Sequence, residues 1–163
     1  MHAEHTVILG IILALPLLGA VLCGIFGKRF LGDRGVNIVG VGSVSIAAAL
    51  SWVLFAQLLG MDEHHRALQQ TLFEWIHVGA ERSNPRIGAF EVDFSLWLDP
   101  LSCLMLLIVT NVGALIHLYS VGYMKGDPGY ARFFAYLNLF IFSMLCLVLG
   151  ENLLVLFLGW EGV

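Results

Sequence analysis

Charged side chains are scarce in this sequence. They make up 12% of its 163 residues, whereas hydrophobic residues make up 59% and the mean hydropathy is +0.88. A soluble globular domain carries about 25% charged residues, so this composition excludes that class and predicts an integral membrane protein. The eight Lys and Arg are scattered, and the net charge is −4. A nucleic-acid partner, which requires a clustered basic patch, is therefore excluded as well.

Cysteine is also rare. Cys23, Cys103 and Cys146 lie far apart inside apolar runs, and none of them is in Cys-x-x-Cys spacing. This pattern indicates neither a disulfide framework nor a zinc or iron–sulfur site. We interpret all three as small buried hydrophobic residues, and we expect no metal and no cofactor on this chain.

Long stretches without charge define the predicted membrane spans. About 20 apolar residues cross the hydrocarbon core of a bilayer. The runs therefore predict four complete transmembrane helices and the start of a fifth, at about residues 6–27, 36–60, 99–123, 131–149 and 152–163. The expected fold class is all-α transmembrane, with a single membrane domain over residues 1–163. The first run lacks the preceding positive charges of a signal peptide, so we interpret it as a helix of the mature protein.

The charges between the predicted helices indicate an orientation. Five of the eight basic residues lie in two short loops, 28–35 and 125–132, which the positive-inside rule assigns to the cytoplasm. The N-terminus with Glu4, the long segment 62–99 and the turn at Glu151 then lie on the outer side. The N-terminus has no transit-type sequence, which favours a bacterial inner membrane with a periplasmic N-terminus.

The long outer segment predicts a short β-hairpin at about residues 69–97. The stretch "FEVDFSLWL" alternates strictly between apolar and polar residues, and "TLFEWIHV" is rich in strand-forming residues. Between them, "ERSNPRIG" is typical of a turn. The apolar face of this hairpin must be covered, either by the ends of the helices or by a neighbouring subunit.

Glu161 is the most unusual residue of the predicted spans. If the fifth helix begins near Asn152, a rise of about 1.5 Å per residue places Glu161 roughly 13 to 14 Å deep, close to the bilayer midplane. An ionised carboxylate there costs at least about 2.5 kcal/mol, so it must be neutral, paired with a cation or in contact with water. We expect Gly159 and Gly162 to leave space for a hydrated pocket. We interpret Glu161 as a proton relay; the alternative is a protonated glutamate that only hydrogen-bonds to a neighbouring helix.

Two further residues are candidates for a role in proton transfer. His117 in the third span can donate and accept a proton near neutral pH. It can also be a purely structural hydrogen-bonding residue, as we expect for Asn111 and Asn138. Asp99 precedes Pro100 and is better placed as the N-cap of a helix than as a point where protons enter.

Residues 97–163 closely resemble subunit L (chain 5) of respiratory complex I, the proton-translocating NADH–quinone oxidoreductase. The motifs "HLYSVGYM", "GYARFFAYLNLF" and "LGWEGV" are together highly specific, and the hairpin and the first two helices match more loosely. The resemblance implies a long antiporter-like membrane protein with inverted half-channel repeats. Its helix-five glutamate, matched here by Glu161, pairs with a lysine on a later helix in a central axis that carries protons. His117 matches a polar position near that axis.

The same resemblance implies what lies outside this chain. NADH, FMN, the iron–sulfur clusters and quinone would be bound by other subunits, and the partners would be the other membrane subunits of complex I and the lipid bilayer. The later helices of the family have no counterpart here, so we expect an N-terminal fragment that cannot pump protons alone. Two alternatives stay open: the large subunit of a multi-subunit sodium/proton antiporter, and a non-pumping membrane scaffold.

Overall fold

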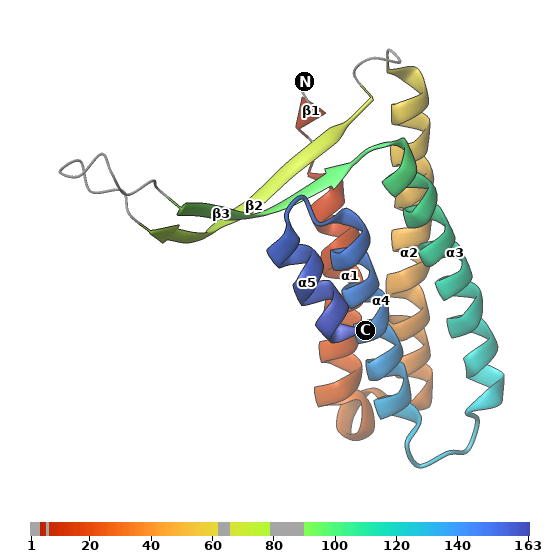
Figure 1. Ribbon diagram of the computed structural model, residues 1–163. Helices are drawn as coiled ribbons and strands as arrows, with labels where there is room; N and C mark the ends of the chain where they lie inside the picture. The colour runs from red at the N-terminus through yellow and green to blue at the C-terminus, as the bar shows by residue number, and fades with distance from the viewer. Residues whose placement is uncertain (1–3, 6, 62–65, 79–89) are drawn as a thin grey trace.

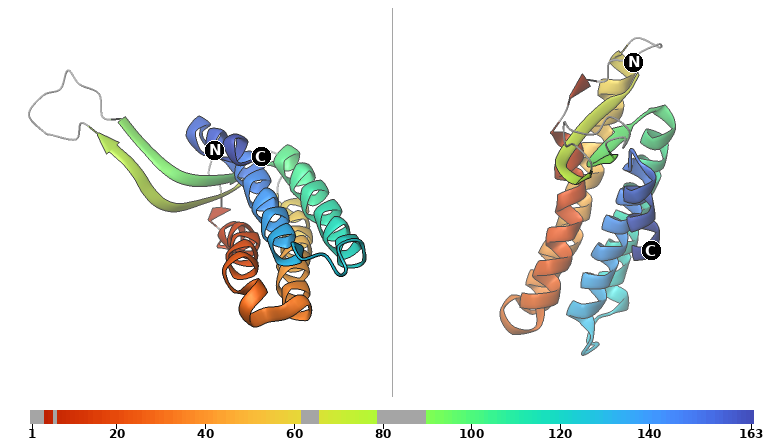
Figure 2. Two further views of the ribbon diagram at one scale, coloured as in Figure 1. Left: turned by 90° about the horizontal axis from the view of Figure 1, so that it is seen from below. Right: turned by 60° about the vertical axis from the view of Figure 1, so that its left-hand side comes forward.

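The structure, a computed structural model, describes residues 4–5, 7–61, 66–78 and 90–163. Its helices run side by side in a bundle, and a sheet crosses one end of the bundle and extends well beyond it (Figures 1 and 2). Within the described residues, four helices are long and apolar enough to cross a membrane. The predicted fold class, a helical membrane protein with a β-hairpin between its second and third helices, is confirmed.

The first two helices are joined without a loop. Helix α1 (Ile8–Val21) continues into a π-helical segment, η1 (Leu22–Leu31), and α2 (Gly32–Gly60) follows directly. A loop was expected at 28–35, but the chain reverses there through a wide helical turn (Figure 1). Gly32 makes this possible because its φ of 60° is one that glycine adopts readily and other residues do not.

The remaining helices begin at polar caps or glycine turns. Asp99 caps α3 (Pro100–Tyr123), and Asn152 caps the short α5 (Leu153–Gly162) by accepting hydrogen bonds from the backbone at Leu154 and Val155. Helix α4 (Tyr130–Leu149) follows a turn in which Gly126 has a φ of 87°. Helix α4 is central, because it packs against α1, α2, α3 and α5.

The sheet has three strands in the order β1–β2–β3. The predicted hairpin is present as β2 (Leu68–Val78) paired antiparallel with β3 (Phe90–Leu98). Its predicted turn at 81–88 lies outside the described residues. The sequence did not predict β1 (Glu4–His5), which pairs in parallel with the start of β2, because two residues are too short to show a periodic pattern.

Two irregularities in β2 make the hairpin strongly amphipathic. The pairing with β3 shifts between Thr71 and Phe73 and again between Glu74 and Ile76, as at β-bulges. An extra residue at a bulge breaks the alternation of side chains, so two apolar neighbours can share a face. Leu72 and Phe73 accordingly line the same groove.

The half of the sheet nearest the bundle covers the ends of the helices. Its buried side chains join those of α1 to α5 in one hydrophobic core, whose members include Leu9, Ile12, Val44, Leu54, Leu96, Leu98, Leu106 and Leu145. The expected cover for the hairpin's apolar face is therefore found over this half of the sheet. The other half extends past the bundle in every view (Figures 1 and 2).

Candidate functional site

Glu161 lies in the last turn of α5, on the side of the helix that faces away from α4. Val155 and Gly159 are the buried residues of α5, and Gly159 contacts α4. Each residue of an α-helix turns about 100°, so Glu161 is about 200° from Gly159 around the axis. Its side chain is exposed in this chain, as are those of Phe157 and Trp160.

The depth of Glu161 follows from the contact between α5 and α4. Gly162 lies against Ser143, which is six residues before the end of α4 at Leu149. At about 1.5 Å per residue, Glu161 therefore lies about 9 Å below the sheet-side end of α4. Figure 1 shows the C-terminus beside α4, well inside the height of the bundle. Glu161 thus lies within the length of the helix bundle and not at its end.

Gly159 and Gly162 bring α5 close to α4. A Cβ atom on Gly159 would lie 2.8 Å from the backbone of both Leu147 and Ser143, and a Cβ on Gly162 would collide with the Ser143 side chain. Small residues permit such close packing of membrane helices. A groove of about 370 Å³ does begin beside Gly162, but its walls are mainly apolar and Glu161 does not line it. The expectation that the two glycines open a hydrated pocket for the carboxylate is therefore wrong.

The described part of the chain offers Glu161 no partner. No hydrogen bond or ion pair to its carboxylate is formed by any residue that the structure describes. The basic residues Lys125 and Arg132 lie in and beside the turn between α3 and α4, at the opposite end of the bundle from the sheet (Figure 1). A cation that pairs with Glu161 would have to come from outside the described residues.

His117 has the opposite environment. It is only 1% exposed in the interface of α3 with its neighbours, and its ring packs edge-on against Phe134 of α4 at 6.1 Å between centroids. Its Nδ1 lies 2.8 Å from the carbonyl oxygen of Gly113, so we assign the proton to Nδ1 because a carbonyl can only accept. Nε2 is buried and has no hydrogen-bond partner among the described residues.

Within the described chain, the two ring nitrogens of His117 have one protein partner between them. A relay takes up a proton on one ring nitrogen and releases it from the other. Here Nδ1 is bonded to a carbonyl of its own helix, and Nε2 faces no donor or acceptor in the described chain.

The structure does not bring His117 and Glu161 together. His117 contacts Phe134 and Gly162 contacts Ser143, and these two residues of α4 are nine positions apart. That spacing corresponds to about 13 Å along the helix axis. The two residues lie on different helices at different depths, so they do not form one site.

Asp99 lies at the start of α3, next to the sheet. Its Oδ1 accepts a hydrogen bond of 2.6 Å from the backbone N–H of Ser102, and Pro100 is the first helical residue. This is the geometry of a capping side chain, which satisfies one of the free N–H groups at a helix start.

Hydrogen bonds between side chains tie α2 to its neighbours. Ser43 donates to Asn138 Oδ1 at 2.7 Å, and Asn138 Nδ2 donates to the carbonyl of Gly40 at 3.3 Å. Trp52 donates to Asn111 at 3.2 Å, so both asparagines that were expected to link helices do so. A further pair, Ser51 and Thr110 at 3.1 Å, was missed because hydroxyl residues in apolar runs carry no pattern of their own.

The described residues contain no group of three or more His, Cys, Asp or Glu side chains that could hold a metal ion. Cys23, Cys103 and Cys146 are buried and unpaired, as expected of small hydrophobic residues. The candidate site is therefore an exposed carboxylate within the length of the bundle, without a group of metal ligands among the described residues.

Chains of two solved membrane complexes share the fold. A chain of the archaeal membrane-bound sulfane sulfur reductase, a respiratory membrane complex, matches with a TM-score of 0.69 and 23% identity over 95% of this chain and 21% of that chain. A chain of the Mrp complex from Dietzia sp. matches with a TM-score of 0.66 and 24% identity over 94% of this chain and 14% of that chain. At these identities the likeness concerns the fold alone.

Sequence comparison is more specific. Residues 85–134 match the family model described as NADH-ubiquinone oxidoreductase (complex I), chain 5 N-terminus. The chain is 42% identical to NADH-quinone oxidoreductase subunit L of Mycobacterium tuberculosis over 94% of its length, and 44% identical to that of Escherichia coli over 95%. Against NADH-ubiquinone oxidoreductase chain 5 of Marchantia polymorpha the identity is 39% over 94% of this chain. The resemblance to subunit L of complex I is thereby confirmed.

These relatives are much longer than this chain. The matched regions cover 22%, 23% and 21% of the three proteins, so the chain spans about a fifth of the length of the curated relatives it matches.

Proposed function

We propose that this chain is part of a membrane subunit of NADH–quinone oxidoreductase that takes part in proton translocation coupled to quinone reduction. The observation that carries the proposal is the position of Glu161. It is a carboxylate on the exposed side of a helix, at membrane depth, within a chain 42–44% identical to subunit L. An ionisable residue in this position is expensive and is a marker of proton or ion pathways.

Glu161 would act by holding and releasing a proton. No described residue neutralises its charge, so the carboxylate requires a proton, water or a cation from another segment. The resemblance implies a lysine on a later helix as that cation. Movement of charge on such a lysine would change the balance between the ionised and protonated forms of Glu161, and so release or recapture the proton.

The other sequence candidates receive structural roles in this proposal. Asp99 caps α3, and His117 bonds to Gly113 within its own helix. We assign neither of them a step in proton transfer.

The surroundings of the site follow from the same proposal. The resemblance implies that NADH, FMN, the iron–sulfur clusters and quinone are bound by other subunits. The basic segments at η1 and at the turn between α3 and α4 lie at the end of the bundle opposite the sheet (Figure 1). This supports a bacterial inner membrane orientation with the N-terminus and the sheet outside. The partners would be the other membrane subunits of the complex, and the chain alone would not pump.

The test is Glu161→Gln in the assembled complex, reconstituted in sealed vesicles. Glutamine keeps the size and hydrogen-bonding capacity of the side chain but cannot release a proton. We expect NADH oxidation to persist in part while the number of protons moved per electron falls. Glu151→Gln is the matched control, because Glu151 is exposed in the turn before α5 and accepts a hydrogen bond from Gln69 at 2.8 Å. An unchanged proton-to-electron ratio in Glu161→Gln would contradict the proposed role.

A second candidate is the large subunit of a multi-subunit sodium/proton antiporter. It is favoured by one observation, the fold shared with the chain of the Mrp complex. The same vesicles separate the two functions. An antiporter exchanges sodium for protons without NADH, whereas the proposed subunit moves protons only while NADH is oxidised.

A further inference from the structure

The connection between α4 and α5 is joined to the edge strand of the sheet. Strand β3 pairs with β2 on one side only, because the strand order is β1–β2–β3. On its other edge, Gly150 forms an antiparallel bridge with Leu96. The backbone N–H of Glu151 donates to the carbonyl of Ser95 at 3.0 Å. The chain that leads into α5 is therefore bonded to β3 in a fixed register.

Asn152 adds a third contact, and its side chain bonds to two segments at once. Its Oδ1 accepts hydrogen bonds from the backbone N–H groups of Leu154 at 3.1 Å and Val155 at 3.0 Å, which caps the start of α5. Its Nδ2 donates to the carbonyl of Asp93 in β3 at 2.8 Å. One amide group thus joins the first turn of α5 to the sheet. We call the contacts of residues 150–152 with β3 the β3–α5 clasp.

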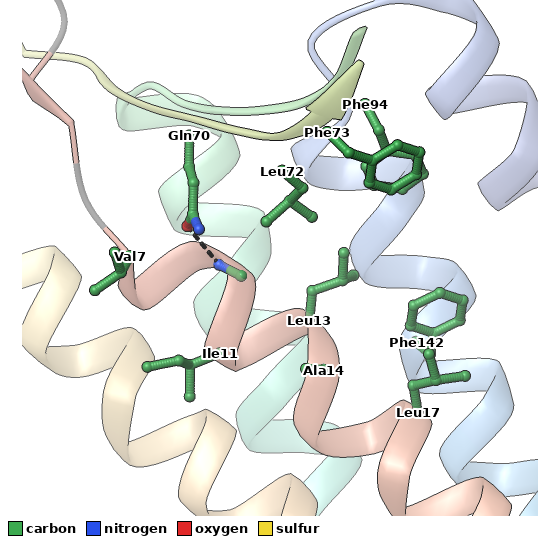
Figure 3. Close-up of a pocket in the computed structure, with 11 residues that line it drawn as sticks. Val7, Ile11, Leu13, Ala14, Leu17, Gln70, Leu72, Phe73, Phe94 and Phe142 are labelled. Atoms are coloured by element: carbon green, nitrogen blue, oxygen red, sulfur yellow. Dashed lines mark hydrogen bonds between the residues drawn. The ribbon is translucent and has the colours of Figure 1, made fainter. Parts of the chain in front are cut away.

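The sheet is itself anchored on the helix bundle. In Figure 3 the side chain of Gln70 in β2 points toward the start of α1, where its Oε1 accepts a 2.7 Å hydrogen bond from the backbone N–H of Gly10. Glycine permits this contact, because a Cβ there would lie 2.7 Å from the Gln70 amide nitrogen. Leu96 and Leu98 of β3 are fully buried in the core that the sheet shares with the helices. The position of β3 therefore follows that of the bundle.

The contact between α5 and α4 fixes the separation of the two helices better than the height of α5 along the bundle. Val155 and Gly159 are the buried residues of α5, and only Val155 has a side chain. Packed helices interlock when ridges of side chains fit into grooves. The glycine face at Gly159 and Gly162 lets α5 approach α4 closely but provides no such ridge. The clasp is therefore the contact that determines where α5 begins.

The start of α5 determines where Glu161 lies. Asn152 and Glu161 are nine residues apart, which corresponds to about 13 to 14 Å along the helix. A shift of the helix start by one residue would move the carboxylate by about 1.5 Å and turn it by about 100°. A displacement of about 1 Å can slow a step that depends on alignment by roughly 10²-fold.

We propose that Asn152 is a positioning residue for Glu161, and that the β3–α5 clasp sets the height and direction at which α5 presents the carboxylate. The inference rests on the proposed role of Glu161 in proton transfer. Asn152 handles no proton and acts only through the placement of α5. The alternative is that Asn152 is an N-cap and nothing more, as Asp99 is for α3.

The experiment separates the clasp from the cap with Asn152→Ser in the assembled complex. Serine is about as good an N-cap as asparagine, but it has no amide group to donate to the Asp93 carbonyl. Infrared difference spectroscopy during NADH oxidation follows the carboxylic acid C=O band that is missing from Glu161→Gln. We expect this band to move to another frequency in Asn152→Ser. NADH oxidation should continue while fewer protons are moved per electron.

Two further variants control for the cap and for folding. Asp99→Ser exchanges the N-cap of α3 in the same way without touching α5, so its Glu161 band should stay at the wild-type frequency. Asn152→Asp also keeps a good cap and replaces the amide donor by an oxygen, so it should move the band as Asn152→Ser does.

The outcomes distinguish the inference from the function on which it rests. A wild-type complex without any band that depends on Glu161 would overturn both. A band that is present but stays at its wild-type frequency in both Asn152 variants would overturn the inference alone and leave Asn152 a cap. An equal shift in Asp99→Ser would overturn it as well, because the exchange of any helix cap would then have the same effect.

Discussion

Polar residues within the length of the bundle have contrasting environments in the interior between α2, α3 and α4 and on the outer side of α5. In the interior, Asn138 is fully buried and bonded to Ser43 and Gly40 on α2. On α5, Glu161 is exposed and no described residue bonds to its carboxylate. Two polar groups in similar apolar stretches of sequence therefore differ: Asn138 is hydrogen-bonded within the fold, and the carboxylate of Glu161 is not hydrogen-bonded by any described residue.

This difference distinguishes polar residues that stabilise the fold from a polar residue that we propose to act in function. A buried polar group is costly unless it is hydrogen-bonded, so those that a fold satisfies internally stabilise the packing of its helices. A carboxylate that is left without a partner by its own helices requires an interaction elsewhere. His117 is intermediate, because one ring nitrogen is bonded within its helix and the other has no partner in the described chain.

The largest expected effect concerns the contact that holds α5 on α4. Gly159→Ala places a methyl group against the backbone of Leu147, so we expect a loss of about 1–3 kcal/mol in the free energy of unfolding, the usual cost of overpacking. Gly42→Ala on α2 is the control because no atom lies within 4 Å of its added Cβ. It should be neutral or stabilise the helix by up to about 1 kcal/mol. Denaturant unfolding in detergent micelles measures both, and equal effects would show that α5 does not pack on α4 as described.

The interior polar contacts come next. Asn138→Ala should cost about 1–3 kcal/mol of unfolding free energy, because it removes the hydrogen bonds to Ser43 and Gly40 from a fully buried site. Asn111→Ala removes the contact with the half-exposed Trp52 and should cost less, about 0.6 kcal/mol, as measured for hydrogen bonds between membrane helices. The same unfolding assay compares the two variants. A larger loss of stability in Asn111→Ala than in Asn138→Ala would show that Asn138 does not form these buried hydrogen bonds.

The cap of α3 has a smaller effect. Asp99→Ala should cost about 1 kcal/mol, whereas Asp99→Asn should keep most of the stability because asparagine is also a good N-cap. Proton translocation by the assembled complex should be unchanged in Asp99→Asn. If this variant is as stable as the wild type but slower in translocation, Asp99 handles protons and is more than a cap.

The smallest effect is expected at His117. His117→Leu removes one hydrogen bond within α3 and also the buried Nε2 that has no partner, so the stability should change by less than about 1 kcal/mol. Proton translocation in vesicles should be unaffected. A fall as large as that of Glu161→Gln would mean that His117 lies on the proton path after all.

Much of the fold could be predicted from the sequence because bilayer thickness sets the length of charge-free runs. The cap at Asp99 and the alternation of β3 could also be predicted, since each depends on neighbouring residues in the sequence. The missed features depend on contacts that the local sequence does not encode. β1 exists only through its pairing with β2, and the bulges in β2 hide the alternation that a regular strand would show.

The candidate site shows the same limit. The identity of Glu161 as the unusual residue follows from the sequence, but the direction of its side chain does not. Gly159 and Gly162 are close to it in sequence, which suggested open space around the carboxylate. In the helix they lie on the side that contacts Ser143 and Leu147, and Glu161 lies on another side. Only the packing of α5 on α4 distinguishes these two arrangements.

The central claim is that Glu161 gains and loses a proton while the complex works, and infrared difference spectroscopy of the assembled complex during NADH oxidation tests it most directly. The account predicts a carboxylic acid C=O band that changes during turnover and is missing from the difference spectrum of Glu161→Gln. A spectrum without any change that depends on Glu161 would contradict the account and leave this carboxyl group a structural contact.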